Sequence, residues 1–198
     1  MFYYRGMEER ARRIVESAVE LAEKGGFEAV RLRDVASHAG VALGTLYRRF
    51  RSKEDLLLAA LEQEVAGLEQ RMTRRPPKGE TRLERVTSFF QAATRALCRR
   101  PNLARAMIRA VTTDDPELTQ KMASFHARVG DFVTMALRGA EAPGEALPAT
   151  DEEQALARSL QMVWFAALVG WSGGLHGQPG IVEQTRVAAE LMLRDRGD

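Results

Sequence analysis

Apolar residues recur along this chain with the period of an α-helix, and this spacing constrains the fold more than any other feature. They return every three or four positions, between prolines and glycines that interrupt the pattern. No stretch alternates apolar and polar residues for long enough to predict a strand. The pattern therefore predicts an all-α fold, with helices at about 8–24, 32–39, 43–50, 53–74, 80–99, 102–112, 116–138, 151–172 and 179–195.

Pro76 and Pro77 end the fourth predicted helix and mark the predicted domain boundary. Proline inside a helix removes a backbone hydrogen bond and clashes with the preceding turn. Three predicted regions follow: a small domain of three helices at 1–52, a connecting helix at 53–75, and a larger helical domain at 76–198. The acidic stretch GAEAPGEALPAT at 139–150 is expected to separate two helices of the larger domain.

The composition is that of a globular protein with a nearly balanced charge of +2. A single cysteine, Cys98, excludes an intramolecular disulfide and fits a reducing compartment. No apolar run approaches the ~20 residues of a membrane span, and the N-terminus lacks the apolar segment of a signal peptide. These features predict a cytoplasmic protein without membrane contact.

Positive charge gathers around the stretch GVALGTLYRRFRSK at 40–53. Between residues 31 and 53, six basic residues stand against one acidic residue, Asp34; the basic residues are Arg31, Arg33, Arg48, Arg49, Arg51 and Lys53. A solvated charged surface is the ordinary explanation of such a run. The alternative is a surface that binds a polyanion.

The order of helices around this stretch favours the second explanation. Two short helices, joined by a turn that contains Gly40 and preceded by a longer helix, are typical of a helix-turn-helix unit. Leu46 and Phe50 are four residues apart and share the inward face of the second short helix. Its other faces can meet base edges and phosphates in the major groove of DNA.

The run LRDVASHAGVALGTLYRRFRSKEDLL resembles the DNA-binding signature of TetR-family regulators, with A-x-x-A-G-V-x-x-G-T-L-Y-x-x-F-x-S-K matched over 36–53. The resemblance implies an N-terminal helix-turn-helix domain that binds a double-stranded DNA operator. Two positions depart from the family pattern: Ala42 cannot cap the recognition helix, and Leu43 can touch a thymine methyl but cannot donate a hydrogen bond. The predicted DNA-binding residues are Arg33, Leu43, Gly44, Thr45, Tyr47, Arg48, Arg49 and Lys53.

Large apolar side chains at helical spacing fill the region after residue 76. They are expected to form a core, and a helical bundle also commonly holds its ligand between helices, so a small apolar effector is a predicted partner. His126 either bonds such a ligand or has a structural role. The candidate pocket residues are Phe89, Met107, Val111, Phe125, His126, Met162, Trp164 and Trp171.

The predicted helix at 151–172 is apolar nearly all round, which requires two packing partners. One face is expected to line the interior of the domain, and the other to meet a second subunit. In TetR-like proteins the last two helices form a four-helix dimer interface, so the resemblance implies a homodimer. The small residues Ala166, Ala167 and Gly170 are expected to allow close approach there.

Within the family, VALGTLYRRF and RRPNLARAM are similar to repressors of steroid and cholesterol catabolism, which respond to acyl-CoA thioesters. The sequence thus favours a repressor released by a bulky apolar effector, with a drug-responsive repressor of an efflux pump as an alternative. Two further alternatives are a small helical enzyme with an apolar substrate and a helical scaffold for protein partners. No HExxH, P-loop or metal-spaced Cys/His motif occurs, and no catalytic residue, metal or cofactor is predicted.

Overall fold

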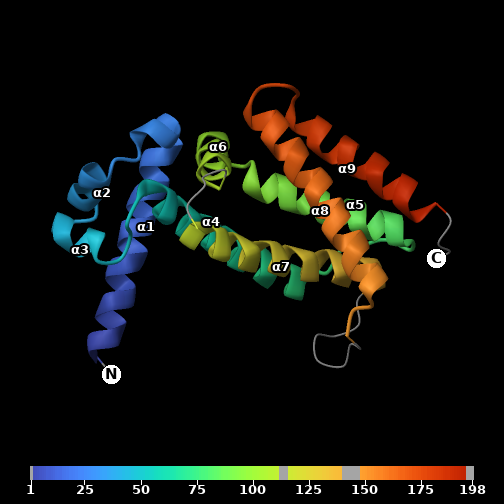
Figure 1. Cartoon of the computed structure of the whole chain (residues 1–198), viewed down its shortest axis with the longest axis horizontal. Helices are drawn as coiled ribbons and strands as arrows, with labels where there is room; N and C mark the ends of the chain where they lie inside the picture. The colour runs from blue at the N-terminus through green and yellow to red at the C-terminus, as the bar shows by residue number, and fades with distance from the viewer. Residues whose placement is uncertain (1, 112–115, 140–147, 195–198) are drawn as a thin grey trace. The chain divides into compact units, whose positions relative to one another are not determined.

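The computed structural model describes residues 2–111, 116–139 and 148–194, and within these ranges every regular element is a helix (Figure 1). The prediction of an all-α fold is confirmed. Residues 140–147 of the predicted acidic connection lie outside the described ranges. Along the described part of the chain, no helix has the length and apolar character needed to cross a membrane. The helices are α1 (Phe2–Ala29), α2 (Leu32–His38), α3 (Leu43–Tyr47), α4 (Lys53–Arg74), α5 (Arg82–Leu97), α6 (Pro101–Ala110), α7 (Pro116–Arg138), α8 (Asp151–Ser172) and α9 (Gln178–Leu193).

The helices form two compact units, and each unit combines two stretches that are separate in the sequence. Unit 1 contains Met1–Glu64 and Arg99–Met122, and unit 2 contains Val65–Cys98 and Ala123–Asp198. Helices α4 and α7 therefore begin in unit 1 and end in unit 2. The segment after Arg99 joins unit 1 because α6, most of whose apolar residues are buried, packs along α1.

Helix α1 begins at Phe2 instead of the expected position near residue 8, and it is broken at Gly25 and Gly26. Gly26 has φ +67° and ψ −158°, a conformation that is open to glycine and rarely to other residues. A Cβ on Gly25 would lie 2.7 Å from the Cβ of Ala29, which is too close for any side chain. The expected break is confirmed at these glycines, and one further turn follows it, ending at Ala29.

Unit 2 is built around α5, α8 and α9, with α8 and α9 side by side and α5 packed against α9 (Figure 1). The ring of Phe90 lies 5.0 Å from that of Phe89 and 5.7 Å from that of Trp164, centroid to centroid. The indole N–H of Trp164 donates to the hydroxyl of Thr94 at 2.9 Å. The core of this unit thus contains an aromatic cluster, and the buried indole in it is hydrogen-bonded.

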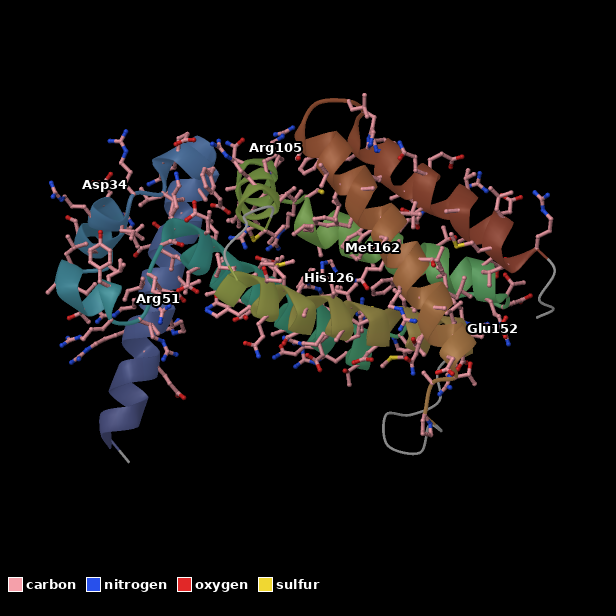
Figure 2. All side chains as sticks on the ribbon, in the orientation of Figure 1. Asp34, Arg51, Arg105, His126, Glu152 and Met162 are labelled. Atoms are coloured by element: carbon pink, nitrogen blue, oxygen red, sulfur yellow. The ribbon has the colours of Figure 1, made fainter. Side chains whose placement is uncertain are left out.

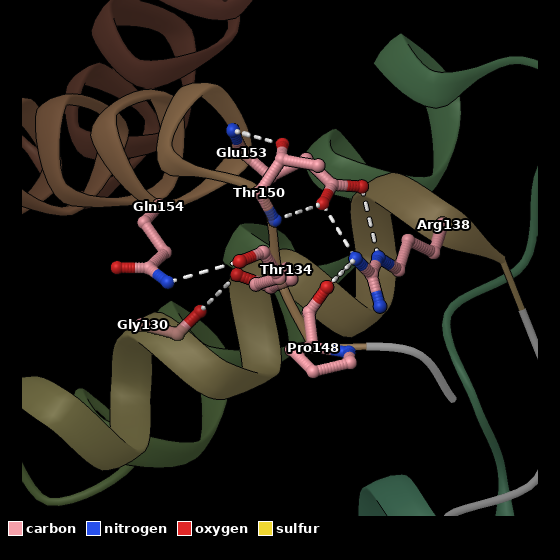
Figure 3. Close-up of polar contacts among 8 residues, drawn as sticks. Gly130, Thr134, Arg138, Pro148, Thr150, Glu153 and Gln154 are labelled. Atoms are coloured by element: carbon pink, nitrogen blue, oxygen red, sulfur yellow. Dashed lines mark hydrogen bonds and ion pairs between the residues drawn. The ribbon is translucent and has the colours of Figure 1, made fainter. Parts of the chain in front are cut away.

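A polar cluster joins the end of α7 to the start of α8 (Figure 3). Thr150 and Glu153 form a reciprocal capping box on α8. Both oxygens of Glu153 also accept hydrogen bonds from the Arg138 guanidinium, at 2.8 and 2.6 Å. Arg138 additionally donates to the carbonyl of Pro148 at 3.0 Å. The carboxylate of Glu153 therefore binds Arg138 at the end of α7 and also takes part in the cap that begins α8.

The Glu153 cluster predicts a pH-dependent contribution to stability. The hydrogen bond from Arg138, followed by those at Thr150, lowers the pKa of Glu153 from 4.5 to about 2. The ionised carboxylate therefore stabilises the fold above about pH 4.5, and this stabilisation is lost as the pH falls toward 2. We expect Glu153→Gln to lower the free energy of unfolding at pH 7 by about 1 kcal/mol.

Thermal denaturation between pH 7 and pH 2 tests this. The difference between the wild type and Glu153→Gln should shrink below about pH 4.5, and Asp151→Asn, which removes an exposed acid from the same helical turn, should have a smaller effect. A difference in melting temperature that does not change with pH would contradict the role of the ionised carboxylate.

Candidate functional site

The second short helix of the predicted helix-turn-helix is held in place by its buried residues. Helix α3 spans only Leu43–Tyr47, so the predicted end at residue 50 is wrong. Arg48 is its C-cap, and beyond it the N–H groups of Arg49 and Phe50 both donate to the carbonyl of Leu46 at 2.9 Å, a turn and not a regular continuation of the helix. No side chain caps its start at Ala42, as the sequence predicted. The two predicted anchors are confirmed: Leu46 is fully buried and Phe50 nearly so.

The turn between α2 and α3 has a defined hydrogen-bonding pattern. Gly40 has φ +64°, and its N–H donates to the carbonyl of Ser37 at 3.2 Å. The N–H of Val41 donates to the carbonyl of Ala36 at 3.0 Å. These two bonds form a Schellman motif, which ends α2 and directs the chain into α3. Gly40 thus makes the predicted turn, because the motif needs a residue with positive φ.

The predicted DNA-binding residues are brought together on the solvent side of this motif. Tyr47 is 52% exposed, although large aromatic side chains are usually covered. The guanidinium of Arg48 donates to the hydroxyl of Thr45 at 3.1 Å, which orients both side chains at the surface. Figure 2 shows nitrogen-tipped side chains projecting around α2 and α3, near the labelled Arg51. Arg33, Gly44, Arg48 and Arg49 are also exposed, and Leu43, Thr45 and Lys53 are partly exposed.

Gly44 in the first turn of α3 has no structural reason to be glycine within the protein. A Cβ built at this position meets no atom within 4 Å, and the backbone there has no positive φ. Glycine costs roughly 1 kcal/mol relative to alanine inside a helix, and here no packing within the chain offsets this cost. Such a bare surface suits a close approach by the backbone of another molecule.

The start of α4 is fixed by a nearly buried carboxylate, Asp55. The backbone N–H of Asp55 donates to the Ser52 hydroxyl at 3.1 Å, which caps the first turn of α4. Its carboxylate accepts from the N–H of Arg51 at 3.1 Å and from the ammonium of Lys121 at 2.5 Å. The sequence did not reveal Lys121, because it lies 66 residues away and no local pattern marks it.

The predicted effector residues do not all fall in one unit. Met107 is buried and Val111 is partly buried, and both belong to unit 1. In unit 2, Phe89, Trp164 and Trp171 are buried in the core, Phe125 and His126 are partly buried, and Met162 is 47% exposed.

A polar pair, Gln161 and His126, lies among the aromatic residues of unit 2. His126 is labelled in Figure 2. The side-chain amide of Gln161, only 2% exposed, is 2.7 Å from Nδ1 of His126. The rings of Phe125 and Phe165 lie nearly perpendicular to the imidazole, with ring centroids at 5.4 and 5.8 Å. Burial lowers the pKa of His126, so its ring is neutral at pH 7. With the amide as donor to Nδ1, the imidazole proton is on Nε2, which is left as a donor.

Exposed apolar side chains occur on both α8 and α9, and we call this set the apolar strip: Met162 and Val169 on α8, Val187 and Leu191 on α9. Ala166 lies between the two α8 residues on the same helix face and is exposed. The other two small residues expected at this surface have different roles. Ala167 is buried inside its own unit, and Gly170 leaves room for His176, whose ring atom would lie 2.9 Å from an added Cβ.

Comparison with known proteins gives matches along most of the chain. Residues 14–60 match the family described as bacterial regulatory proteins, tetR family, and residues 79–192 match the tetracyclin repressor-like C-terminal domain. The transcriptional repressor KstR of Rhodococcus jostii is 34% identical, over 94% of this chain and 84% of that protein. A TetR transcriptional regulator from Rhodococcus sp. RHA1 has a similar solved structure, with a TM-score of 0.80 and 28% identity over 96% of this chain and all of that one. Thermus thermophilus FadR, solved with lauroyl-CoA, shares the fold with a TM-score of 0.72 and 24% identity over 94% of each chain.

The open position of Gly44 generates a test that separates folding from binding. We expect Gly44→Ala to leave the melting temperature unchanged or slightly raised, because the added methyl group meets no protein atom and alanine favours the helix. We expect the same substitution to weaken binding to duplex DNA, because the methyl group would separate the two surfaces.

Gly67→Ala is the matched control, since its Cβ would meet only the end of the flexible Arg71 side chain in α4. DNA binding is measured by fluorescence anisotropy and stability by thermal denaturation. Equal DNA affinity of Gly44→Ala and Gly67→Ala would rule out close contact at α3.

Proposed function

The chain belongs to the TetR family of bacterial regulatory proteins, and we propose that it is a transcriptional repressor that binds a near-palindromic operator as a homodimer and leaves it on binding an apolar effector. It acts in the cytoplasm, where the DNA is. The observation that carries this proposal is the cluster of exposed basic and hydroxyl side chains around α3, whose own position is determined by buried Leu46.

The geometry of α3 supports recognition of DNA in the major groove. Thr45 and Gly44 are in the first turn of the helix, the part that approaches base edges in a helix-turn-helix unit. Tyr47, Arg48 and Arg49 follow, where hydroxyl and guanidinium groups can bind phosphates. A dimer would present two copies of α3 to half-sites about one helical turn, ~34 Å, apart.

The apolar strip on α8 and α9 supports a homodimer through the last two helices. Four large apolar side chains on two adjacent helices are exposed in the single chain, and exposed apolar surface favours association. A second copy of the same strip is its natural partner, because a two-fold interface joins identical surfaces. The exposed Ala166 between Met162 and Val169 would let the two copies of α8 approach closely.

The polar pair in unit 2 supports an effector that is apolar but carries a hydrogen-bond acceptor. His126 offers Nε2–H between two phenyl rings, and Gln161 holds the imidazole in that tautomer. A neutral donor suits the carbonyl oxygen of a thioester or ketone. FadR, which shares the fold, was solved in complex with lauroyl-CoA. We therefore choose lauroyl-CoA as the first probe for this chain.

Footprinting on the DNA upstream of the gene for this chain, with and without lauroyl-CoA, tests the proposal. We expect a protected, near-palindromic site that lauroyl-CoA releases and that free lauric acid and free CoA leave bound. His126→Phe should retain operator affinity and require roughly five- to tenfold more acyl-CoA for release, the effect of losing one hydrogen bond to the ligand.

Absence of any protected site in the upstream DNA would end the repressor proposal. Release by lauric acid as readily as by its thioester would assign the effector to another chemical class. An unchanged response of His126→Phe would return His126 to a structural role.

The dimer is tested through the apolar strip. We expect Val187→Glu with Leu191→Glu to convert a dimer into a monomer in sedimentation velocity, since four carboxylates would meet at the two-fold interface. Leu175→Glu, in the turn between α8 and α9, is a matched control and should remain dimeric. A monomeric wild type, or a dimeric double variant, would show that the strip is not the interface.

A further inference from the structure

Two cations from distant parts of the chain contact the same two residues in unit 1. Lys53 begins α4, and its Nζ lies 3.8 Å from the centroid of the Phe27 ring and 3.5 Å from Oε2 of Glu28. Arg109 lies near the end of α6; its Cζ is 4.4 Å from the same centroid, and its Nη1 is 2.9 Å from Oε1 of Glu28. One ring and one carboxylate thus hold both cations, and we refer to them as the Phe27–Glu28 pair.

The break in α1 determines where the Phe27–Glu28 pair lies. Phe27 and Glu28 directly follow Gly25 and Gly26, where the backbone leaves helical geometry. A side chain on Gly25 would collide with Ala29, and the backbone of Gly26 favours glycine. The two glycines therefore hold the last turn of α1 in the position from which its ring and carboxylate meet Lys53 and Arg109.

The two cations compete for the pair. Like charges repel, so Arg109 on one oxygen of Glu28 weakens the attraction of that carboxylate for Lys53. The side chains are 29% exposed for Lys53, 60% for Arg109 and 68% for Glu28. Surface ion pairs and cation–π contacts of this kind are individually weak. A DNA phosphate can therefore replace Glu28 as the partner of Lys53.

Helix α6 is fastened to α1 at its other end by separate contacts. Arg100, the residue before α6, pairs with Glu23 at 3.0 Å and with Glu64. The side-chain amide of Asn102 donates to the backbone carbonyl of Glu23 at 2.9 Å. The first turn of α6 is thus held by contacts that do not include Lys53. A displacement of the last turn of α6 from α1 changes the contacts of Arg109 with the pair.

We propose that the Phe27–Glu28 pair competes with DNA phosphate for Lys53 and that Arg109 decides the competition. With Arg109 on Glu28, Lys53 is available to a phosphate. When Arg109 leaves, Glu28 retains Lys53 and the phosphate contact weakens. Phe27, Glu28 and Arg109 are then positioning residues for a DNA-contacting lysine, an inference that rests on the proposed function only through the contact of Lys53 with DNA.

Anisotropy titrations of a labelled duplex from the upstream DNA, at several salt concentrations, test the competition. We expect Arg109→Ala to weaken binding by roughly three- to tenfold and to flatten the salt dependence by about one phosphate contact. Adding Glu28→Gln to Arg109→Ala should restore most of the affinity. In a Lys53→Ala background, Arg109→Ala should have no further effect.

The Lys53→Ala background separates this inference from a general effect of charge. Loss of one positive charge would weaken DNA binding whether or not Lys53 is present, so an equal effect of Arg109→Ala in both backgrounds would overturn the inference. Arg99→Ala, which removes an exposed arginine from the same unit, is the charge-matched control and should cause a much smaller loss.

A measurement without DNA tests the pair by itself. The acetylation rate of the Lys53 amine, followed by peptide mass spectrometry, should fall in Arg109→Ala and rise in Glu28→Gln. If the rates change in this way but no duplex binds the wild type, the repressor proposal fails and the Phe27–Glu28 pair stands. Unchanged acetylation rates in both variants would overturn the proposed effect of the pair and Arg109 on Lys53, whatever the DNA titrations show.

Discussion

Burial of Leu46 is the interaction on which the rest of the candidate site depends, because it holds α3 in place. Helix α3 has five residues and no side-chain cap, and isolated helices of this length are unstable in water. Its conformation therefore comes from packing, through Leu46 and Phe50, against the preceding helices. The polar side chains between and beside these anchors are oriented by the same packing. A surface that reads DNA needs such a rigid support, because misplaced donors lose their hydrogen bonds.

Residues from α6 and the start of α7 pack against the helices of the N-terminal part of the chain. Helix α6 packs along α1, and Lys121 from the start of α7 binds Asp55 at the start of α4. Arg109 meets Glu28 beside Lys53. The packing of α6 is apolar, like the anchors of α3, whereas the two ion pairs are charged and their cations, Lys121 and Arg109, are exposed. The fold thus combines a permanent apolar support with polar contacts that are weak enough to change.

Much of the helix-turn-helix could be predicted because its signals are local. Gly40, Leu46 and Phe50 act through turns and packing periods within a few residues, and the structure confirms all three. The extent of α3, the start of α1 at Phe2 and the helical turn that follows its glycine break were not predicted correctly, since helix ends depend on competing weak terms. Gln161 beside His126 was missed because no local pattern links positions that are 35 residues apart.

The sequence by itself determined the helical fold, the TetR-family signature at 36–53 and the apolar anchors, because periodicity and turn chemistry are properties of neighbouring residues. Only the tertiary structure decided which groups meet across the chain. It placed residues 99–122 with the N-terminal helices, paired Gln161 with His126, and set Lys53 and Arg109 on one ring and one carboxylate. The reason is physical: such contacts depend on how helices pack, and packing is decided by buried surfaces distributed over the whole chain.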